Sequence, residues 1–283
     1  MSSKSRKIPR GLRRLSNLHP VIVMLVTVGL IFVCWKVCAT VSDSHGLVVE
    51  RGVGADSLLR VKLPDGVAEQ MVSYPGFFVS FNSEMHQPNY VAWELTADET
   101  DGEAGRVGFD VDHDVEGSAT LDDYRGSGYD RGHMMPAADA KWSEDVMHAT
   151  HYLTNICPQD HKLNAGAWQT VESNCRRWAL RDSALLIVCG PVLSDRLTRT
   201  IGENAVPVPE RFFKVILAPW AKPPRGIAFV MPNGAVDGGA QAAAVSIDEV
   251  ERITGFDFFP ALDDSIEDVV EAQCAYHLWQ RRR

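Results

Sequence analysis

The sequence lacks internal repeats and low-complexity tracts, and it contains no helix-turn-helix, RRM or zinc-finger pattern. The lack of repeats excludes solenoids and propellers, which are built from units that recur at a fixed spacing. The lack of a groove-reading module excludes recognition of a base sequence by one of those motifs. With 283 residues and 45% hydrophobic content, the chain is instead predicted to form one globular domain of roughly 200 to 240 residues plus an N-terminal appendage.

Positive charge is scarce outside the N-terminus. Residues 1–36 hold seven Lys or Arg and no acid, which leaves 21 bases against 37 acids, or a net charge of about −16, on the rest of the chain. Such a domain has no broad cationic field, which argues against tight nucleic-acid binding by counterion release alone. It does not exclude chemistry on a single phosphate, because a metal ion and a few arginines can hold one.

The N-terminus places six basic residues ahead of an apolar run, Val21–Trp35. This order is typical of a signal peptide or a signal anchor. Lys36 interrupts the run, but residues 37–41 extend it to roughly 20 residues, which can span a bilayer if Lys36 snorkels. The positive-inside rule then places the N-terminus in the cytoplasm and the domain outside, in the periplasm or the extracellular space.

We therefore divide the chain into residues 1–20 as a basic cytoplasmic segment, 21–41 as a transmembrane signal anchor, 42–70 as a spacer and 71–283 as the folded domain. Two alternatives stay open for the N-terminus. Cleavage after Ala39 would release a secreted protein, because Val37 and Ala39 suit a cleavage site. The Arg-rich, acid-free start also suits a mitochondrial presequence, although the continuous apolar run argues against it.

Five apolar runs bounded by Pro, Gly or turn residues predict strands: Phe77–Phe81, Tyr90–Leu95, Ala184–Val192, Phe212–Leu217 and Gly226–Met231. Helical periodicity marks three further stretches: Trp142–Thr154, Asn164–Asp182 and Asp264–Gln280. Ser246 and Glu249 have the spacing of a capping box for another helix. Successive strands without regular βαβ alternation predict an α+β domain with a central antiparallel sheet flanked by helices.

The six cysteines divide into two near the apolar segment, Cys34 and Cys38, and four in the domain. Four cysteines allow three pairings, and the sequence does not choose among them. Cys189 lies inside an apolar strand and is expected to be a buried thiol.

The stretch Tyr129–Glu172 contains most of the candidate catalytic residues. If the chain around Asp130–His133 is extended, Arg131 and His133 point to one face, and Asp130 and Gly132 point to the other. A cation and a titratable base then share one surface. Gly132 has no side chain, so a substrate or a neighbouring strand can approach the backbone there.

The predicted helix Asn164–Asp182 places Asn164, Trp168 and Glu172 at steps of four, along one stripe. An asparagine at the helix start and a glutamate two turns later can therefore face the same cavity. Asn164 also suits the simpler role of an N-cap. Trp168 is expected to belong to the core and not to stack on a base.

Three blocks in this order, DRGH at 130–133, NICPQ at 155–159 and LNAGAWQTVE at 163–172, resemble the DNA/RNA non-specific endonucleases of the ββα-metal (His-Me finger) group, relatives of the Serratia nuclease and mitochondrial endonuclease G. The resemblance runs from about Gly76 to about Leu262. It implies the ββα-metal nuclease fold for the predicted domain.

The resemblance implies that His133 is the general base that deprotonates the attacking water, and that Asn164 binds one divalent cation through its amide oxygen. An oxygen ligand and a shell of waters suit Mg²⁺, which Mn²⁺ could replace. Glu172 would accept hydrogen bonds from metal-bound water and orient that shell.

Two arginines and one asparagine complete the predicted site. Arg131 could donate a bidentate fork to the phosphate, or pair with a nearby carboxylate. Arg106 is the best positional match for the family's phosphate-binding arginine, and Arg125 is the alternative. Asn155 is expected to hold the His133 strand or the water network in place.

A zinc site built from the nearby histidines and cysteine is the competing interpretation of this region. Its ligands would be His148, His151, Cys157 and His161. Their spacing fits no common zinc template.

Chemistry directed at the backbone without base contacts predicts cleavage of DNA and RNA without sequence preference. The resemblance implies metal-dependent hydrolysis to 5′-phosphate and 3′-hydroxyl ends. A membrane-anchored nucleic-acid-binding protein without catalysis and a phosphodiesterase for small substrates are the alternatives. The sequence does not settle the oligomeric state, and a homodimer stays open.

Overall fold

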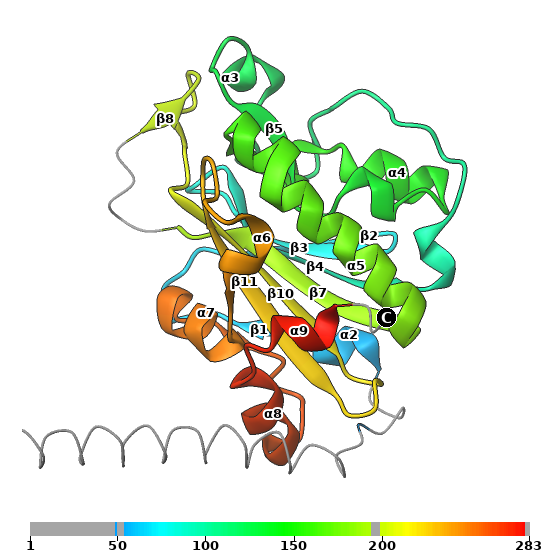
Figure 1. Cartoon of the computed structure of the whole chain (residues 1–283). Coiled ribbons are helices and arrows are strands. Elements are labelled where there is room, and N and C mark those ends of the chain that lie inside the picture. Colours follow the sequence, from blue (N-terminus) through cyan, green and yellow to red (C-terminus); the bar gives the residue numbers. More distant parts are fainter. Residues whose placement is uncertain (1–48, 50–53, 194–198, 281–283) are drawn as a thin grey trace, which may run out of the picture. The chain divides into compact units, whose positions relative to one another are not determined.

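The computed structural model describes residue 49 and residues 54–193 and 199–280 (Figure 1). The predicted cytoplasmic segment, residues 1–20, and the predicted anchor, residues 21–41, lie outside the described residues. Within the described ranges, no helix combines the length and the apolar character needed to cross a membrane.

A seven-stranded sheet forms the centre of the domain, with the strand order β12-β11-β10-β7-β4-β3-β2. Every neighbouring pair is antiparallel. The strands are β2 (Gln70–Tyr74), β3 (Phe77–Asn82), β4 (Gln87–Thr96), β7 (Ala184–Pro191), β10 (Arg211–Ala218), β11 (Arg225–Pro232) and β12 (Ala244–Val245). The five predicted strands and the α+β class with a central antiparallel sheet are confirmed.

Both faces of this sheet are covered, and each face has its own core. On one face, Trp93, Ile187 and Ile216 pack with residues of α5 (Gln169–Asp182). On the other, the alternate strand positions pack with α7 (Ile247–Thr254) and α8 (Asp264–Glu271). Burial on both faces explains why the central strands are almost continuously apolar and do not alternate with polar residues.

Shorter elements complete the domain. The helices are α2 (Ala55–Leu58), α3 (Leu121–Tyr124), α4 (Glu144–Thr150), α6 (Gly239–Ala242) and α9 (Tyr276–Trp279), and the 3₁₀ turns are η2 (Asp98–Thr100), η3 (Ala137–Asp139) and η4 (Leu153–Asn155). The remaining strands pair as β1 (Val61–Lys62) with β13 (Asp257–Phe258), β5 (Asp130–His133) with β6 (Ile156–Gln159), and β8 (Thr200–Ile201) with β9 (Val206–Pro207).

Part of the segment predicted as a spacer packs onto the domain. Leu58 and Leu59 are buried in the core beneath α7 and α8. Val61 pairs with Phe258. Two adjacent leucines in a mixed segment produce no periodicity, which explains why the sequence pattern did not mark this contact.

The structure corrects two predicted helices. Only Glu144–Thr150 of the stretch Trp142–Thr154 is α-helical, with Ser143 as its N-cap. The C-terminal stretch Asp264–Gln280 forms α8 and then a separate α9. The second helix turns back because Trp279 is buried and its ring packs 4.8 Å from that of Trp178 on α5.

The four domain cysteines are free thiols. Cys189 is fully buried, as expected. Ser246 caps α7 by accepting a hydrogen bond from the backbone N–H of Glu249. The carboxylate of Glu249 accepts from Arg252 and not from the backbone of Ser246, so the predicted capping box is only half formed.

The docking of α9 generates a stability prediction. Trp279→Ala is expected to lower the free energy of unfolding by about 3 to 5 kcal/mol, because it removes a buried indole and its contact with the ring of Trp178. Urea unfolding followed by fluorescence measures the change. The neighbouring Leu278, 36% exposed, provides the control: Leu278→Ala should cost clearly less, and equal losses would show that the burial of Trp279 contributes little.

Candidate active site

The three sequence blocks fold into one ββα unit. Strand β5 carries the DRGH block, and it pairs antiparallel with β6, so that Gly132 lies opposite Cys157 and His133 opposite Ile156. After β6, the chain enters a π-helical turn, η5 (Leu163–Trp168), which continues directly into α5. The first and third blocks therefore meet although they are far apart in the sequence.

Gly132 permits a close approach between the two strands. A Cβ atom at this position would lie 2.2 Å from Oε1 of Gln159. Gln159 is fully buried, so its side chain has little room to move away. The expected close contact of a neighbouring strand with Gly132 is confirmed.

Arg131 and His133 both contact the ring of Phe109. The guanidinium carbon lies 4.5 Å from the ring centroid, and the imidazole centroid lies 5.1 Å from it. The two side chains therefore share one face of β5, as the alternation predicts.

The imidazole of His133 is held in its neutral form. Its Nε2 atom is buried and has no hydrogen-bond partner among the described residues. Burial, followed by the neighbouring His151, Arg106 and Arg131, lowers the pKa of His133 to about 3. Because this pKa lies far below neutral pH, the ring is uncharged there and can accept a proton.

The backbone around His133 is fixed from several sides. Trp168 donates its indole N–H to the carbonyl of His133 at 3.2 Å. Asn155 is buried, accepts from the backbone N–H of Met135 at 2.9 Å and donates to its carbonyl at 3.0 Å. A further bond from Asn155 reaches the carbonyl of Thr150 at 2.8 Å. These contacts suit the positioning of β5 and leave Asn155 without access to a substrate.

Asp130 orients Asn164. The amide nitrogen of Asn164 donates to Oδ2 of Asp130 at 2.9 Å, and Nδ1 of His161 lies 2.8 Å from the same oxygen. Since a carboxylate accepts and does not donate, the amide group cannot be reversed without losing this bond. The amide oxygen of Asn164 is left as the group that can bind a cation.

The π-helical turn corrects the predicted stripe. Lys162 is the N-cap of this turn, and Asn164 bonds a side chain, so the N-cap interpretation of Asn164 is wrong. Gly166 has non-helical angles, with φ −112° and ψ −111°. The wider turn breaks the four-residue spacing between Asn164 and Glu172, and such turns occur often at functional sites.

Glu172 lies in a network of partly and fully buried charges. Burial raises the pKa of its carboxyl to about 7, although Lys214, Arg176 and Arg106 oppose the shift and Asp139 adds to it. The nearby Asp139 is buried and accepts from Arg176 at 2.7 Å. Arg106 thus influences both His133 and Glu172.

Lys214 is a buried cation that the sequence analysis missed. It is 1% exposed, and its ammonium lies 4.3 Å from the ring centroid of Trp168 and 3.4 Å from the carbonyl of Met134. Burial lowers its pKa, but Cys189, Glu172, Cys175 and Asp139 raise it more, so the net shift is upward. The available signal was a single lysine in the middle of the apolar run Phe212–Leu217.

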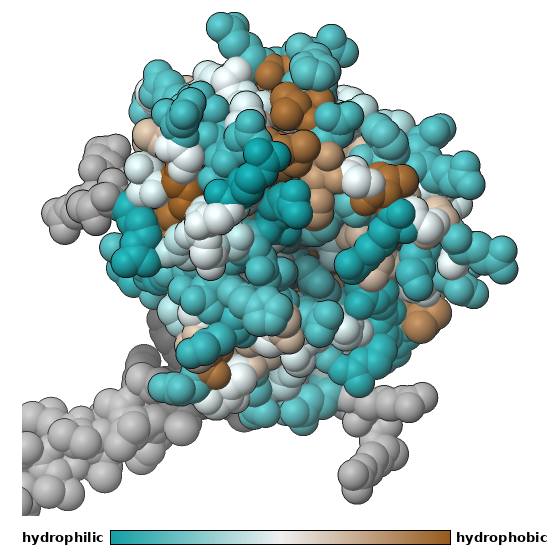
Figure 2. Space-filling view, turned by 90° about the horizontal axis from the view of Figure 1, so that it is seen from above, coloured by the Kyte–Doolittle hydropathy of each residue, from teal (hydrophilic) through white to brown (hydrophobic). Residues whose placement is uncertain are grey.

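An open groove borders the site. Its volume is about 540 Å³. Residues of α3, β5, η5 and the adjacent loops line it: Phe109, Leu121, Tyr124, Arg125, Gly126, Tyr129, Asp130, Arg131 and Asn164. The end of the molecule that carries α3 and β5 is mostly hydrophilic, with scattered apolar patches (Figure 2). Arg125 lies at this groove and pairs with the exposed Asp122, whereas Arg106 lies nearer to His133.

The zinc interpretation is not supported. His151 bonds the carbonyl of Met147, and His161 bonds Asp130. Among the described residues, the one group of His, Cys, Asp and Glu side chains close enough to share a metal ion lies elsewhere, at Asp248, Glu251 and Glu271.

Comparison with known proteins agrees with this geometry. Zebrafish (Danio rerio) mitochondrial nuclease EXOG is 36% identical over 237 residues, which cover 77% of this chain and 67% of the relative. Bovine (Bos taurus) mitochondrial endonuclease G is 32% identical over 225 residues, which cover 74% of this chain and 75% of the relative. The solved structure of EndoG with EndoGI superposes with a TM-score of 0.64 at 29% identity, over 69% of this chain and 88% of that one.

The match to a family extends over most of the described domain. Residues 54–265 fit the family described as DNA/RNA non-specific endonuclease. They include the ββα unit with His133, Asn164 and Glu172. The chain therefore belongs to the DNA/RNA non-specific endonuclease family and is a nuclease hydrolase related to EXOG and endonuclease G.

Proposed function

We propose that the protein cleaves DNA and RNA at internal phosphodiester bonds without sequence preference, with His133 as the general base and one Mg²⁺ held by Asn164. The observation that carries the proposal is that Arg131 and a neutral His133 share one face of β5. The open, hydrophilic groove supports a polymeric substrate over a small one, because a small ligand is usually enclosed.

In the proposed reaction, the imidazole of His133 takes a proton from the attacking water. The water oxygen bonds to phosphorus while the bond from phosphorus to O3′ breaks, and O3′ takes a proton from solvent water, which leaves 5′-phosphate and 3′-hydroxyl ends. Burial lowers the pKa of His133 most in the free protein, and His151, Arg106 and Arg131 add to the effect. A bound phosphate would offset the charge of the two arginines and raise the pKa of His133 toward the range that suits a base.

The residues fit a hard cation. Asn164 offers an amide oxygen, fixed by Asp130, and Glu172 offers a carboxylate for the ordered water around the ion. When bound, Mg²⁺ or Mn²⁺ would supply positive charge to the phosphoryl oxygens and to the leaving O3′. Arg131 and Arg106 would bind the remaining phosphate oxygens, and Asn155 would keep β5 in place.

Loss of the base tests the assignment. His133→Ala is expected to lower the rate of plasmid cleavage in Mg²⁺ by a factor on the order of 10² or more, and EDTA should stop cleavage by the unchanged protein. The exposed His277 provides a matched control, and His277→Ala should cleave normally. Persistent cleavage by a folded His133→Ala protein would remove His133 from this role.

The orientation of Asn164 by Asp130 generates a second prediction. Asp130→Asn is expected to raise the Mg²⁺ concentration at half-maximal activity by roughly 10- to 100-fold, with recovery at high Mg²⁺, because the amide loses its charged acceptor. Cleavage rates over a Mg²⁺ series measure the shift. Asp65→Asn, an exposed acid, should leave the curve unchanged. An unchanged curve for Asp130→Asn would mean that Asn164 is positioned without it.

Lys214 generates a prediction about pH. Its ammonium lowers the pKa of Glu172, so Lys214→Met should raise that pKa further and keep Glu172 protonated to higher pH. Cleavage is then expected to begin at a higher pH than in the unchanged protein, at equal Mg²⁺. The melting temperature should fall because the neighbouring carboxyl groups of Glu172 and Asp139 lose a compensating cation. The exposed Lys222 is the control: Lys222→Met should alter neither. If cleavage by Lys214→Met begins at the same pH as in the unchanged protein, Lys214 does not control the protonation of Glu172.

We also propose that residues 21–41 anchor the protein, with the nuclease domain outside the cytoplasm. The basic flank and apolar run support the anchor. The names of several relatives, which include the word mitochondrial, support the alternative of a presequence. Alkaline carbonate extraction of the expressed chain distinguishes the two, because a spanning segment stays with the membrane and a cleaved presequence does not.

A further inference from the structure

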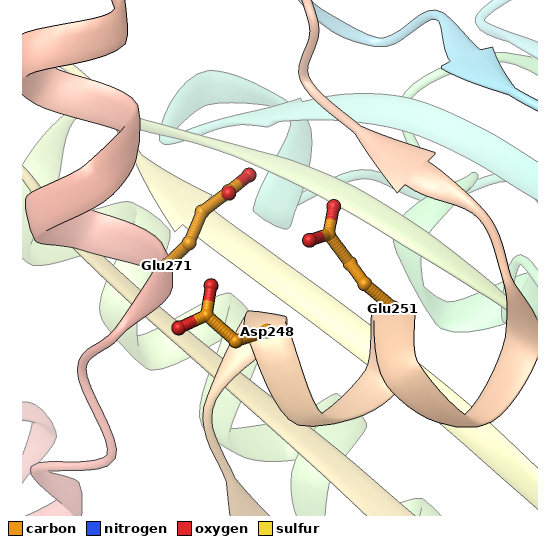
Figure 3. Close-up of side chains that lie close together, drawn as sticks. All are labelled: Asp248, Glu251 and Glu271. Carbon is orange, nitrogen blue, oxygen red and sulfur yellow. The ribbon is translucent and has the colours of Figure 1, made fainter.

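Three carboxylates converge far from the ββα unit. Asp248 and Glu251 lie one turn apart on α7, and Glu271 is the last residue of α8 (Figure 3). Their ligand oxygens all lie within 4.8 Å of one another. Helices α7 and α8 pack on the face of the sheet opposite to α5, so the sheet separates this cluster from His133.

Close packing at one glycine brings the two helices together. A Cβ atom on Gly226 of β11 would lie 2.6 Å from the carbonyl of Val270 and 2.8 Å from Cδ1 of Ile247. These two residues directly precede Glu271 and Asp248 in the chain. The absence of a side chain at Gly226 therefore allows the segments that carry these two acids to pack closely on β11.

Glu271 points into the cluster without a hydrogen-bond partner. Its side chain is 7% exposed, and its Oε1 atom is buried with no partner in the described part of the chain. A buried polar atom without a partner costs roughly 1 to 3 kcal/mol. None of the six ion pairs among the described residues includes Asp248, Glu251 or Glu271.

The surroundings are acidic on every side. Burial, followed by Glu251, Glu267, Asp248 and Asp257, raises the pKa of Glu271 to about 9. Burial and neighbouring acids also raise the pKa values of Asp248 and Glu251. The neighbours come from α7, α8 and β13.

Glu251 is already oriented for binding. Its Oε1 atom accepts from the backbone N–H of Phe258 at 2.8 Å, which leaves Oε2 for a ligand. Asp248 is exposed and Glu271 is buried, so water can complete a coordination shell from the outer side only.

We propose that Asp248, Glu251 and Glu271 bind one hard divalent cation that joins α7 to α8. A set of carboxylate oxygens without nitrogen or sulfur favours Ca²⁺, Mg²⁺ or Mn²⁺ over softer metals. Ca²⁺ fits best, because it accepts irregular arrangements of oxygen ligands, whereas Mg²⁺ requires near-octahedral geometry. The ion stabilises the C-terminal half of the domain and takes no part in phosphodiester cleavage.

Calcium binding is tested in a protein without the candidate catalytic metal ligand. The full chain carrying Asn164→Ala is stripped with EDTA and dialysed against ⁴⁵Ca²⁺, and its melting temperature is measured with and without 1 mM CaCl₂, a concentration on the order of 100 times a typical Kd for such a site. We expect one bound Ca²⁺ per chain and a rise in the melting temperature. Adding Glu271→Gln should abolish both while raising or maintaining the stability without Ca²⁺.

Glu249 provides the matched control. It lies on the same helix, and its carboxylate bonds Arg252, so Glu249→Gln in the Asn164→Ala chain should keep both the bound Ca²⁺ and the thermal shift. Asp248→Asn, at an exposed position, replaces Glu271→Gln if that variant does not fold. Either no Ca²⁺ bound by folded Asn164→Ala protein, or Ca²⁺ still bound after Glu271→Gln, would overturn the proposal; the first result would assign a retained proton to Glu271.

The rate of plasmid cleavage tests whether this site is independent of the nuclease site. Glu271→Gln alone should leave Mg²⁺-dependent plasmid cleavage unchanged at a temperature well below its melting point. Loss of cleavage without loss of structure would contradict the separation of the two sites by the sheet.

Discussion

The pairing of β4 with β7 determines where the active site forms. The two strands are neighbours in the sheet, with Thr96 opposite Ala184, although residues 97–183 separate them in the chain. This long segment must leave and re-enter the sheet at one end, and it carries the whole ββα unit. Two sheet side chains then fix it in place: Cys189 donates to the carbonyl of Met134 at 3.2 Å, and Lys214 lies 3.4 Å from the same oxygen.

Buried charge is the main energetic demand of this arrangement. An isolated ammonium or carboxylate is costly away from water, and the cost is offset only by close partners. Lys214 meets this condition with two aromatic faces, a carbonyl and the anions Glu172 and Asp139. The same charges keep Glu172 ionisable near neutral pH. Structural support and the electrostatics of the site therefore depend on the same side chains.

The sequence was sufficient where a feature depends on local pattern. The apolar runs located the central strands, and the DRGH strand showed its alternation at Arg131 and His133. It was insufficient where a role depends on distant neighbours. The strand alternation placed Asp130 on the face opposite His133, yet its carboxylate holds the amide of Asn164, and Lys214 was hidden in an apolar strand. The turn around Gly166 was missed because a π-helical turn differs from an α-helical one by a single residue.

The additional residue in the π-helical turn changes the direction in which Asn164 points. Each residue of an α-helix turns the chain by about 100° around the helix axis, so one additional residue ahead of Gln169 turns Asn164 relative to the helix that follows. With this change of direction, Asn164 reaches Asp130 while α5 keeps its apolar face on the sheet. Shortening the turn by one residue would preserve the packing of α5 and point the amide of Asn164 in another direction, so the helix and the candidate metal ligand can vary independently.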